Sequence, residues 1–322
     1  MKVVYSPEHL EHQPEFEVID GEHMDYAEKS ARIEVIKRDL EDGGYEIIPP
    51  REFDDLLVSS VHFKRYVDYI KAQSDAVPVG DEDEPQPQRL TSTYITDLGT
   101  PVTNGTFRAA RAAANVALTT MQEVVGGSEA YGLCRPPGHH AGPDQMGGYC
   151  YFNNSAIAAA ELAKEGRAAI LDIDFHHGNG TQEIFYDRSD VMYVSLHADP
   201  DQYFPYIRGR EDETGRGQGE GYNLNLPLSE DTDITTYLQK LAIGLDRTSD
   251  FDPDYLVLSL GFDTYKRDPI AGFNIDINDY SAIGKAIKSA EVPTVIIQEG
   301  GYCVPDLGKL ALSFLSGFEG ET

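Results

Sequence analysis

Residues 168–182 read AAILDIDFHHGNGTQ, and this stretch decides the fold. Its first residues, Ala168–Ile173, are apolar apart from Asp172, and such a run is typical of a strand buried on both faces of a parallel sheet. The run leads directly into aspartate, histidine and glycine residues. Because ligands of open α/β sheets bind at the carboxyl ends of the strands, the stretch predicts a polar site at that edge.

Short apolar segments of the same kind recur along the chain and alternate with segments of helical periodicity. Strands are predicted at 2–5, 45–48, 130–133, 168–173, 191–196, 255–260 and 294–298, and helices at 28–41, 105–125, 153–165, 234–248 and 280–290. This alternation predicts a single α/β domain over residues 1–322, with a mostly parallel sheet covered by helices on both faces. Residues 11–25 are predicted to form a polar loop, and residues 74–103 an extended loop that is partly acidic and interrupted by proline.

The chain is strongly acidic, because 55 Asp and Glu residues against 26 Lys and Arg residues give a formal net charge of −29. This charge disfavours nucleic acid as a partner, and no apolar run approaches the roughly 18 residues of a membrane span. Since the first residues lead into charged sequence rather than a signal peptide, we expect a cytoplasmic protein. A negative surface would steer a cationic small molecule toward the protein, but it is also typical of general solvation or of adaptation to salt.

Three residues at predicted strand ends suggest a metal site. Asp174 and His176 are two residues apart, so in an extended segment their side chains point to the same side, and Asp263 follows the predicted strand 255–260. Together they would form an N/O site with a free position for water, as in catalytic zinc sites, whereas structural zinc usually has thiolate ligands. For any one of these residues alone, a helix cap or a satisfied core histidine is the more common explanation.

Further motifs make the chain resemble the histone-deacetylase-like zinc hydrolases, and most closely their acetylpolyamine amidohydrolase branch. The motifs occur in the family's order and are RPPGHH (135–140), GGYCYFNN (147–154), DIDFHHGNGTQ (172–182), SLH (195–197), GFD (261–263) and EGGY (299–302). The resemblance implies an arginase-like α/β fold. It also implies hydrolysis of an N-acetyl amide to acetate and a free amine.

The same resemblance implies roles for the residues of these motifs. It identifies Asp174, His176 and Asp263 as zinc ligands, and zinc lowers the pKa of bound water and polarises a carbonyl. His140 matches the general base and His139 its electrostatic partner. The resemblance also implies a tyrosine, at position 302 of this chain, whose hydroxyl stabilises the developing oxyanion.

Supporting residues are expected around this centre. Asp172 and Asn179 are candidates for fixing the tautomer and charge of the two histidines, although the sequence leaves open which residue serves which histidine. The resemblance further implies a structural potassium ion near the zinc, held by Asp172, Asp174, His176, Ser195 and Leu196, the last through its backbone carbonyl. An Asp/His/Asp site of this type can also hold Fe(II) or Co(II).

The substrate would reach the metal through a narrow tunnel. Tyr149 and Phe204 match the two aromatic positions that form its walls in the family, although ordinary core packing is the alternative for each. The extended loop at 74–103 resembles the loop that supports a homodimer in the polyamine branch. Asp83, Glu84 and Asp97 are candidates for binding the distal ammonium groups of a small cationic acetylated amine, although an exposed acidic run is more often simply solvated.

Three other functions stay open on the sequence alone. The nearest is an acetyl-lysine deacetylase acting on proteins or peptides, which a short loop and an open rim would favour. A dimanganese ureohydrolase of the same fold would need further aspartates in a DxHxD run, which residues 172–177 lack. A non-catalytic binding protein should have lost a ligand, a tandem histidine or the tyrosine. One departure from the family is Ser30-Ala31-Arg32, where the family often has Pro-Glu-Arg.

Overall fold

The structure, a computed structural model, describes residues 1–19, 21–78, 94–97 and 99–320. Its centre is one eight-stranded sheet in the order β4-β1-β5-β10-β9-β6-β7-β8, and every strand pair in it is parallel. The strands are β1 (Lys2–Val4), β4 (Glu46–Ile48), β5 (Ala130–Gly132), β6 (Ala168–Asp172), β7 (Val191–Ala198), β8 (Asn223–Leu228), β9 (Tyr255–Leu260) and β10 (Thr294–Gln298). The predicted α/β fold with a parallel sheet is therefore confirmed.

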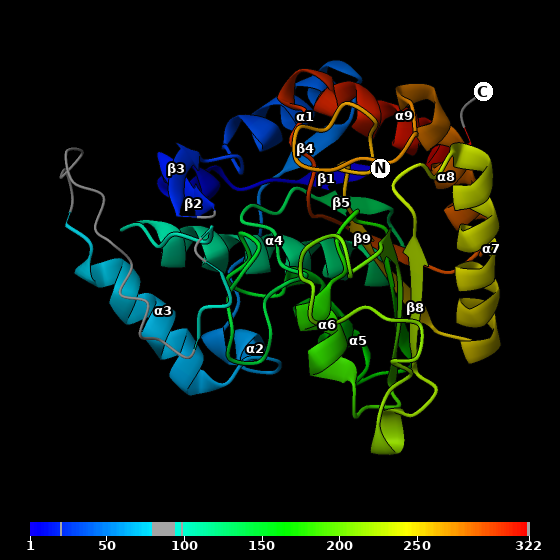
Figure 1. Cartoon of the computed structure of the whole chain (residues 1–322), viewed down its shortest axis with the longest axis horizontal. Coiled ribbons are helices and arrows are strands. Elements are labelled where there is room, and N and C mark those ends of the chain that lie inside the picture. The colour runs from blue at the N-terminus through cyan, green and yellow to red at the C-terminus, as the bar shows by residue number, and fades with distance from the viewer. Residues whose placement is uncertain (20, 79–93, 98, 321–322) are drawn as a thin grey trace.

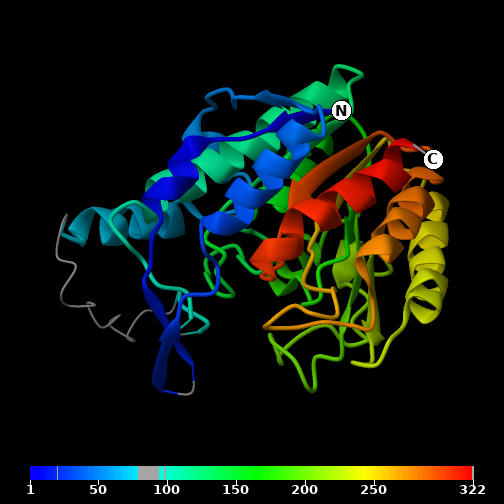
Figure 2. The ribbon, with the colours of Figure 1, turned by 90° about the horizontal axis from the view of Figure 1, so that it is seen from above.

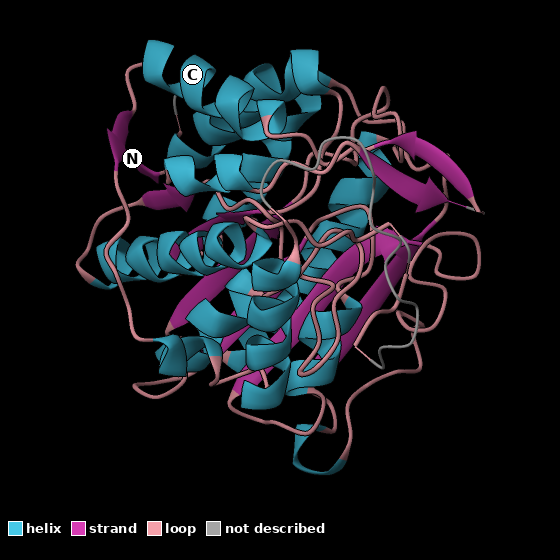
Figure 3. Cartoon of the chain, turned by 90° about the vertical axis from the view of Figure 1, so that its left-hand side faces the viewer, coloured by secondary structure: helices cyan, strands magenta, loops and turns pink. Residues whose placement is uncertain are grey.

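Helices cover both faces of this sheet (Figures 1 and 3). One face carries α1 (Ala31–Asp42), α7 (Ile234–Phe251), α8 (Tyr280–Lys288) and α9 (Leu307–Glu319), and the other carries α2 (Asp55–Val58), α3 (Lys64–Ala76), α4 (Thr106–Val125) and α5 (Asn154–Leu162). Strand β6 shows why both layers form, because Ala169 and Leu171 pack into the first core while Ala168 and Ile170 pack into the second. Successive side chains of a strand point to opposite faces, so an unbroken apolar run serves two cores at once.

Some elements differ from the sequence prediction. The predicted loop 11–25 is wrong in part, because Phe16–Ile19 (β2) and Glu22–Asp25 (β3) form an antiparallel hairpin, which projects from the domain in Figure 2. The pattern also failed to predict β8, α3, α9 and the short α6 (Asn179–Phe185). The predicted loop 74–103 begins too early, since α3 continues to Ala76, and its residues 79–93 and 98 lie outside the described residues.

The carboxyl ends of the central strands lead into the segments that carry the predicted site. Asn153 caps α5, and its side chain accepts a hydrogen bond from the backbone N–H of Ala156, as its place before the helix predicted. Among the described residues, no helix combines the length and the apolar character that crossing a membrane requires. The segments of the predicted site thus follow the carboxyl ends of the central strands.

Candidate metal centre and active site

The three predicted metal ligands lie together at the carboxyl edge of the sheet. Asp174 and His176 follow β6, Asp263 follows β9, and these two strands are neighbours. One potential ligand atom from each residue lies within 4.8 Å of the others. Nδ1 of His176 is 3.0 Å from Oδ2 of Asp263 and 3.5 Å from Oδ1 of Asp174. The two carboxylates are almost completely buried.

This donor set fits a divalent metal ion. Two buried carboxylates facing one imidazole form a hard N/O set that leaves coordination positions open for water and substrate. Burial and the neighbouring Asp174 carboxylate raise the pKa of Asp263, which is the expected effect of two like charges in one buried site. A cation bound between the carboxylates would offset this repulsion. The remaining carboxylate oxygens accept backbone N–H groups, at Phe175 for Asp263 and at Gly300 for Asp174.

Glycine makes room for the two carboxylates. A Cβ atom at Gly300 would lie 2.6 Å from an oxygen of Asp174 and 2.6 Å from an oxygen of Asp263, and one at Gly261 would lie 2.2 Å from Asp174. Real side chains do not tolerate such distances, so the backbone approaches the ligands as closely as it does only because both residues lack a side chain. The glycines of the GFD and EGGY motifs are therefore part of the site.

The tandem histidines have different partners. Nδ1 of His139 is 3.1 Å from the Asp172 carboxylate, and Nδ1 of His140 is 2.7 Å from the side-chain oxygen of Asn179. Burial alone would lower the pKa of His139, but the carboxylates of Asp174 and Asp172 outweigh it and raise the pKa to about 10. Burial and the positive charge of His139 hold the pKa of His140 well below its usual value.

The two shifts have opposite directions. The raised pKa favours the imidazolium form of His139, and the lowered pKa favours the neutral form of His140. Because the Asn179 oxygen can only accept, Nδ1 of His140 carries the proton and its Nε2 has a free lone pair. A neutral imidazole with a free nitrogen is what a general base requires. The structure also settles the open pairing, with Asp172 at His139 and Asn179 at His140.

Tyr302 follows β10 and its ring lies between two side chains. The guanidinium carbon of Arg32 is 4.7 Å from the ring centroid, and the ring of Tyr149 is 5.7 Å away. Burial raises the pKa of Tyr302 well above 10, although the charge of Arg32 opposes the shift. The hydroxyl therefore keeps its proton near neutral pH and can act as a hydrogen-bond donor.

The two aromatic residues that are predicted to line the tunnel contact different residues of the site. Phe204 packs edge-on against His140, with ring centroids 4.8 Å apart, while Tyr149 packs against Tyr302. The Tyr149 hydroxyl donates a hydrogen bond of 2.7 Å to Glu17, a buried carboxylate of β2. Sequence reasoning missed Glu17 because the hairpin that carries it was predicted to be a loop.

The Asp97 carboxylate is hydrogen-bonded within the protein. It accepts hydrogen bonds from the backbone N–H of Gly148 at 2.7 Å and from the hydroxyl of Thr100 at 2.9 Å. It therefore fixes the turn before Tyr149, whose backbone is left-handed with a φ of 67°. Its predicted contact with an ammonium group stays a prediction, and the other two candidates, Asp83 and Glu84, lie outside the described residues.

Three residues of the predicted potassium site lie on the neighbouring strands β6 and β7. Asp172 of β6 pairs in register with Ser195 of β7, and Leu196 follows it. Nε2 of His197 lies 2.8 Å from the Gly209 carbonyl and must donate to it, and Ser195 lies 2.8 Å from Nδ1 of the same ring. Because burial lowers the pKa of His197 to about 4, this Nδ1 accepts the serine proton. The lone pairs of the Ser195 oxygen then stay available for a cation.

Two residues of the motifs have positions that the sequence did not explain. Glu299 accepts hydrogen bonds from the backbone N–H groups of Gly138 and His139 at 2.7 and 3.1 Å, so it holds the segment that carries the tandem histidines. Arg32 donates to the carbonyls of Gly301 and Glu299. No local sequence signal predicts these contacts, because the partners are far apart in the chain.

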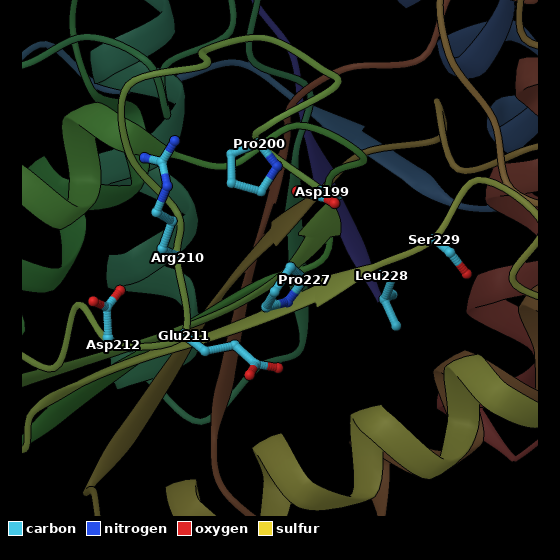
Figure 4. A pocket seen from close by; sticks show the side chains of 8 residues that line it. All are labelled: Asp199, Pro200, Arg210, Glu211, Asp212, Pro227, Leu228 and Ser229. Atoms are coloured by element: carbon cyan, nitrogen blue, oxygen red, sulfur yellow. The ribbon is translucent and has the colours of Figure 1, made fainter.

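A separate hollow of about 440 Å³ lies at the ends of β7 and β8 (Figure 4). It is lined by Asp199, Pro200, Arg210, Glu211, Asp212, Pro227, Leu228 and Ser229. Its lining contains none of the predicted site residues within the described part of the chain. The hollow therefore belongs to the long segment after β7 rather than to the metal centre.

Comparison with known proteins identifies the family of this chain. The family model described as Histone deacetylase domain matches residues 26–318. Acetylpolyamine amidohydrolase 2 of Pseudomonas aeruginosa is 40% identical over 341 aligned residues, which cover 99% of each chain, and the acetylpolyamine amidohydrolase of Mycoplana ramosa is 36% identical and covers 99% of this chain and 100% of its own. The solved acetylpolyamine aminohydrolase of Burkholderia pseudomallei superposes with a TM-score of 0.92 at 36% identity, covering 99% of this chain and 98% of its own. The fold, the metal-ligand geometry and these matches together place the chain in the histone deacetylase family.

Proposed function

We propose that this protein hydrolyses acetylated polyamines or similar small acetylated amines to acetate and free amine, with zinc as its metal. The observation that carries the proposal is the pair of tandem histidines, one cationic on a carboxylate and one neutral on an amide, beside an Asp/His/Asp ligand set. The substrate class rests on the relatives, because proteins named acetylpolyamine amidohydrolase match this chain over nearly its whole length.

The residues of the chain divide the reaction between them. When bound, the metal polarises the amide carbonyl and makes water more acidic. His140 accepts the proton of the attacking water at Nε2 and later gives it to the leaving amine. His139 stays cationic and stabilises the negative charge that develops nearby, while Tyr302 donates its hydroxyl proton in a hydrogen bond to the oxyanion.

We propose that Phe204 and Tyr149 form the walls of a narrow tunnel, which would favour slender substrates. Phe204 and Tyr149 present flat apolar faces beside His140 and Tyr302, and such faces suit an aliphatic chain. We also propose that potassium binds as a structural ion at Asp172, Asp174, His176, Ser195 and Leu196. A homodimer and a cytoplasmic location complete the proposal, and they rest on the resemblance and the composition rather than on contacts within the chain.

Substrate class is tested by comparing kcat/KM of the purified, zinc-loaded enzyme on acetylputrescine, acetylspermidine and an acetyl-lysine peptide. We expect the two acetylated polyamines to be the better substrates. Asp263→Asn should lose bound metal and activity together, and Asp187→Asn, which alters an exposed ion pair with Arg216, is the matched control. A peptide that is turned over much better than both polyamines would replace the proposal with protein deacetylation.

A further inference from the structure

Asp268 is a buried acidic residue on the segment that follows the metal ligand Asp263. Only 9% of it is exposed. Its Oδ2 accepts two backbone hydrogen bonds, from Tyr302 at 2.6 Å and from Cys303 at 3.1 Å. Its Oδ1 accepts a third, from the N–H of Ile270 at 3.1 Å. The carboxylate thus joins the segment after β9 to the segment after β10 at the tyrosine itself.

The backbone around Tyr302 is held from two directions. The guanidinium of Arg32 binds the carbonyls of Glu299 and Gly301, which precede the tyrosine, at 2.6 and 2.5 Å. The carboxylate of Asp268 binds the N–H groups of Tyr302 and of the residue after it. The cationic side chain thus binds carbonyl oxygens, which are acceptors, and the anionic side chain binds N–H groups, which are donors. Hydrogen bonds of this kind, with one charged partner, are stronger than those between neutral groups.

We propose that Asp268 is a positioning residue for Tyr302, which fixes the backbone of the tyrosine so that its hydroxyl stands where the oxyanion develops. The proposal rests on the oxyanion role proposed for Tyr302. The ring packs against Arg32 and Tyr149. A small rotation of the backbone is therefore amplified at the hydroxyl, at the far end of the ring, and a misplacement of about 1 Å can cost on the order of 100-fold in rate.

An asparagine is a weaker anchor than the carboxylate. An ionised Asp offers two oxygens that only accept, whereas an Asn offers one oxygen and an NH2 group that only donates. If the NH2 group of Asp268→Asn faces Ile270, the bonds to Tyr302 and Cys303 remain but lose their charged acceptor, and if it faces Tyr302 and Cys303, both bonds are lost. Hydrogen bonds to a charged acceptor are the stronger ones, so the substitution keeps the size of the side chain and weakens or breaks the anchor.

The test is a double-mutant cycle on the substrate that the wild-type enzyme turns over best. We expect Asp268→Asn to lower kcat by about 10- to 100-fold with little change in KM, because the lost interaction acts in the transition state. In a Tyr302→Phe background the same substitution should lower kcat by less than about 2-fold, since residues that act as a unit are not additive. Asp276→Asn, on the same segment but in an exposed ion pair with Lys266, should behave like the wild type.

Equal losses from Asp268→Asn with and without the tyrosine hydroxyl would overturn the proposal, and so would a rise in KM at normal kcat. A trifluoromethyl ketone analogue of the substrate, which hydrates to a tetrahedral diol, adds a readout that needs no turnover. Its Kd should rise by the factor by which kcat/KM falls, and an unchanged Kd would contradict the positioning role.

If Asp268→Asn does not fold, Asp268→Glu decides the question. It keeps the charge but moves the oxygens by one methylene, so a reduced kcat at normal metal content supports the positioning role and a wild-type kcat overturns it. Wild-type protein that is inactive on all three acetylated amines would instead contradict the proposed function, which separates the two failures.

Discussion

His139 and His140 are neighbours of identical chemistry, and the atoms that face their Nδ1 nitrogens make them different. A carboxylate at His139 favours the cation, and an amide oxygen at His140 fixes a neutral tautomer. The pKa of one is raised to about 10 and that of the other lies well below its usual value. These shifts suit the proposed roles, in which His139 stabilises charge and His140 moves a proton.

The variant Tyr302→Phe tests the hydroxyl of Tyr302 alone, because the aromatic ring stays in place. Tyr302→Phe keeps the ring between Arg32 and Tyr149, so metal content and thermal stability should stay near those of the wild type. We expect kcat to fall by roughly 100- to 1000-fold, the usual loss on removal of one oxyanion donor. Steady-state kinetics with metal analysis measures this, with Tyr186→Phe as the control. Near-normal turnover with metal bound would show that the Tyr302 hydroxyl takes no part in the reaction.

His62 should make stability depend on pH. Its Nδ1 donates to the Gly142 carbonyl, and its Nε2 accepts the N–H of Asn153, both at 2.8 Å. Burial lowers its pKa to about 4 from an ordinary value of 6.5. The unfolded chain therefore binds a proton below about pH 6.5 while the folded chain does not, so the stabilisation is full above that pH and is lost as the pH falls toward 4.

The contribution of His62 is at most about 1.4 kcal/mol of unfolding free energy for each pH unit in this window. Urea unfolding at several pH values between about 7.5 and 4.5 should show a shallower dependence for His62→Gln than for the wild type. His197, whose pKa is also lowered to about 4, titrates in both proteins and cancels in the comparison. Identical pH dependence in the two proteins would show that His62 titrates normally in the fold.

At this scale the sequence predicted that Asp174, His176 and Asp263 would lie together, because each stands at a strand end in a motif. It could not pair Asp172 and Asn179 with their histidines, since that depends on side-chain rotation. It missed Asp268, whose partner Tyr302 is 34 residues away. Long-range contacts between a side chain and a backbone N–H leave no periodic signal in a sequence.

At the scale of elements, the end of β10 shows how tightly backbone and metal ligands fit. A Cβ at Gly300 would lie 2.6 Å from carboxylate oxygens of both Asp174 and Asp263. We expect Gly300→Ala to push the ligands apart and to weaken metal binding by at least about 10-fold, the effect common for residues that orient metal ligands. The control is Gly126→Ala at the end of α4, where the nearest atoms would be 3.3 Å away.

The Gly300→Ala measurement is a competition titration against a chelator of known affinity, with circular dichroism as a check on the fold. Unchanged metal affinity would mean that the ligands can retreat from the new methyl group. Loss of secondary structure in Gly300→Ala, but not in Gly126→Ala, would mean that the added methyl group disrupts the fold at the end of β10 and does not act on the metal ligands alone.

Elements with strong local patterns were predictable and others were not. The continuous apolar runs of β6, β9 and β10 identified them, because both faces of these strands are buried. The hairpin β2–β3 was missed because all four residues of its second strand, Glu22–Asp25, are exposed, and three of them are polar. That error mattered for the site, because β2 supplies Glu17, which binds the Tyr149 hydroxyl.

For the whole molecule, the net charge of −29 should make stability depend on salt. Repulsion among surface carboxylates disfavours the compact state, and salt screens it over a Debye length that falls from roughly 10 Å at 0.1 M to 3 Å at 1 M. We expect the thermal midpoint to rise by several degrees as NaCl increases from about 0.05 to 1 M. A midpoint that falls or stays constant would contradict this.

The same salt series separates the two explanations of the acidic surface. If the surface steers cationic substrates, kcat/KM for acetylspermidine should fall with salt while that for a neutral acetylated amide stays constant. If the acidity serves solvation or salt adaptation, both substrates should respond alike.

Strand β10 lies in the middle of the sheet, between β5 and β9, although it is the last strand of the chain. During synthesis on the ribosome, residues 294–298 emerge after all the other strands. Until then the nascent chain lacks the strand that joins β4-β1-β5 to β9-β6-β7-β8, so any sheet that these strands form has an unpaired edge at β5 or β9 that invites aggregation. A premature stop codon after α8 should therefore yield an aggregation-prone fragment rather than a smaller, weaker enzyme.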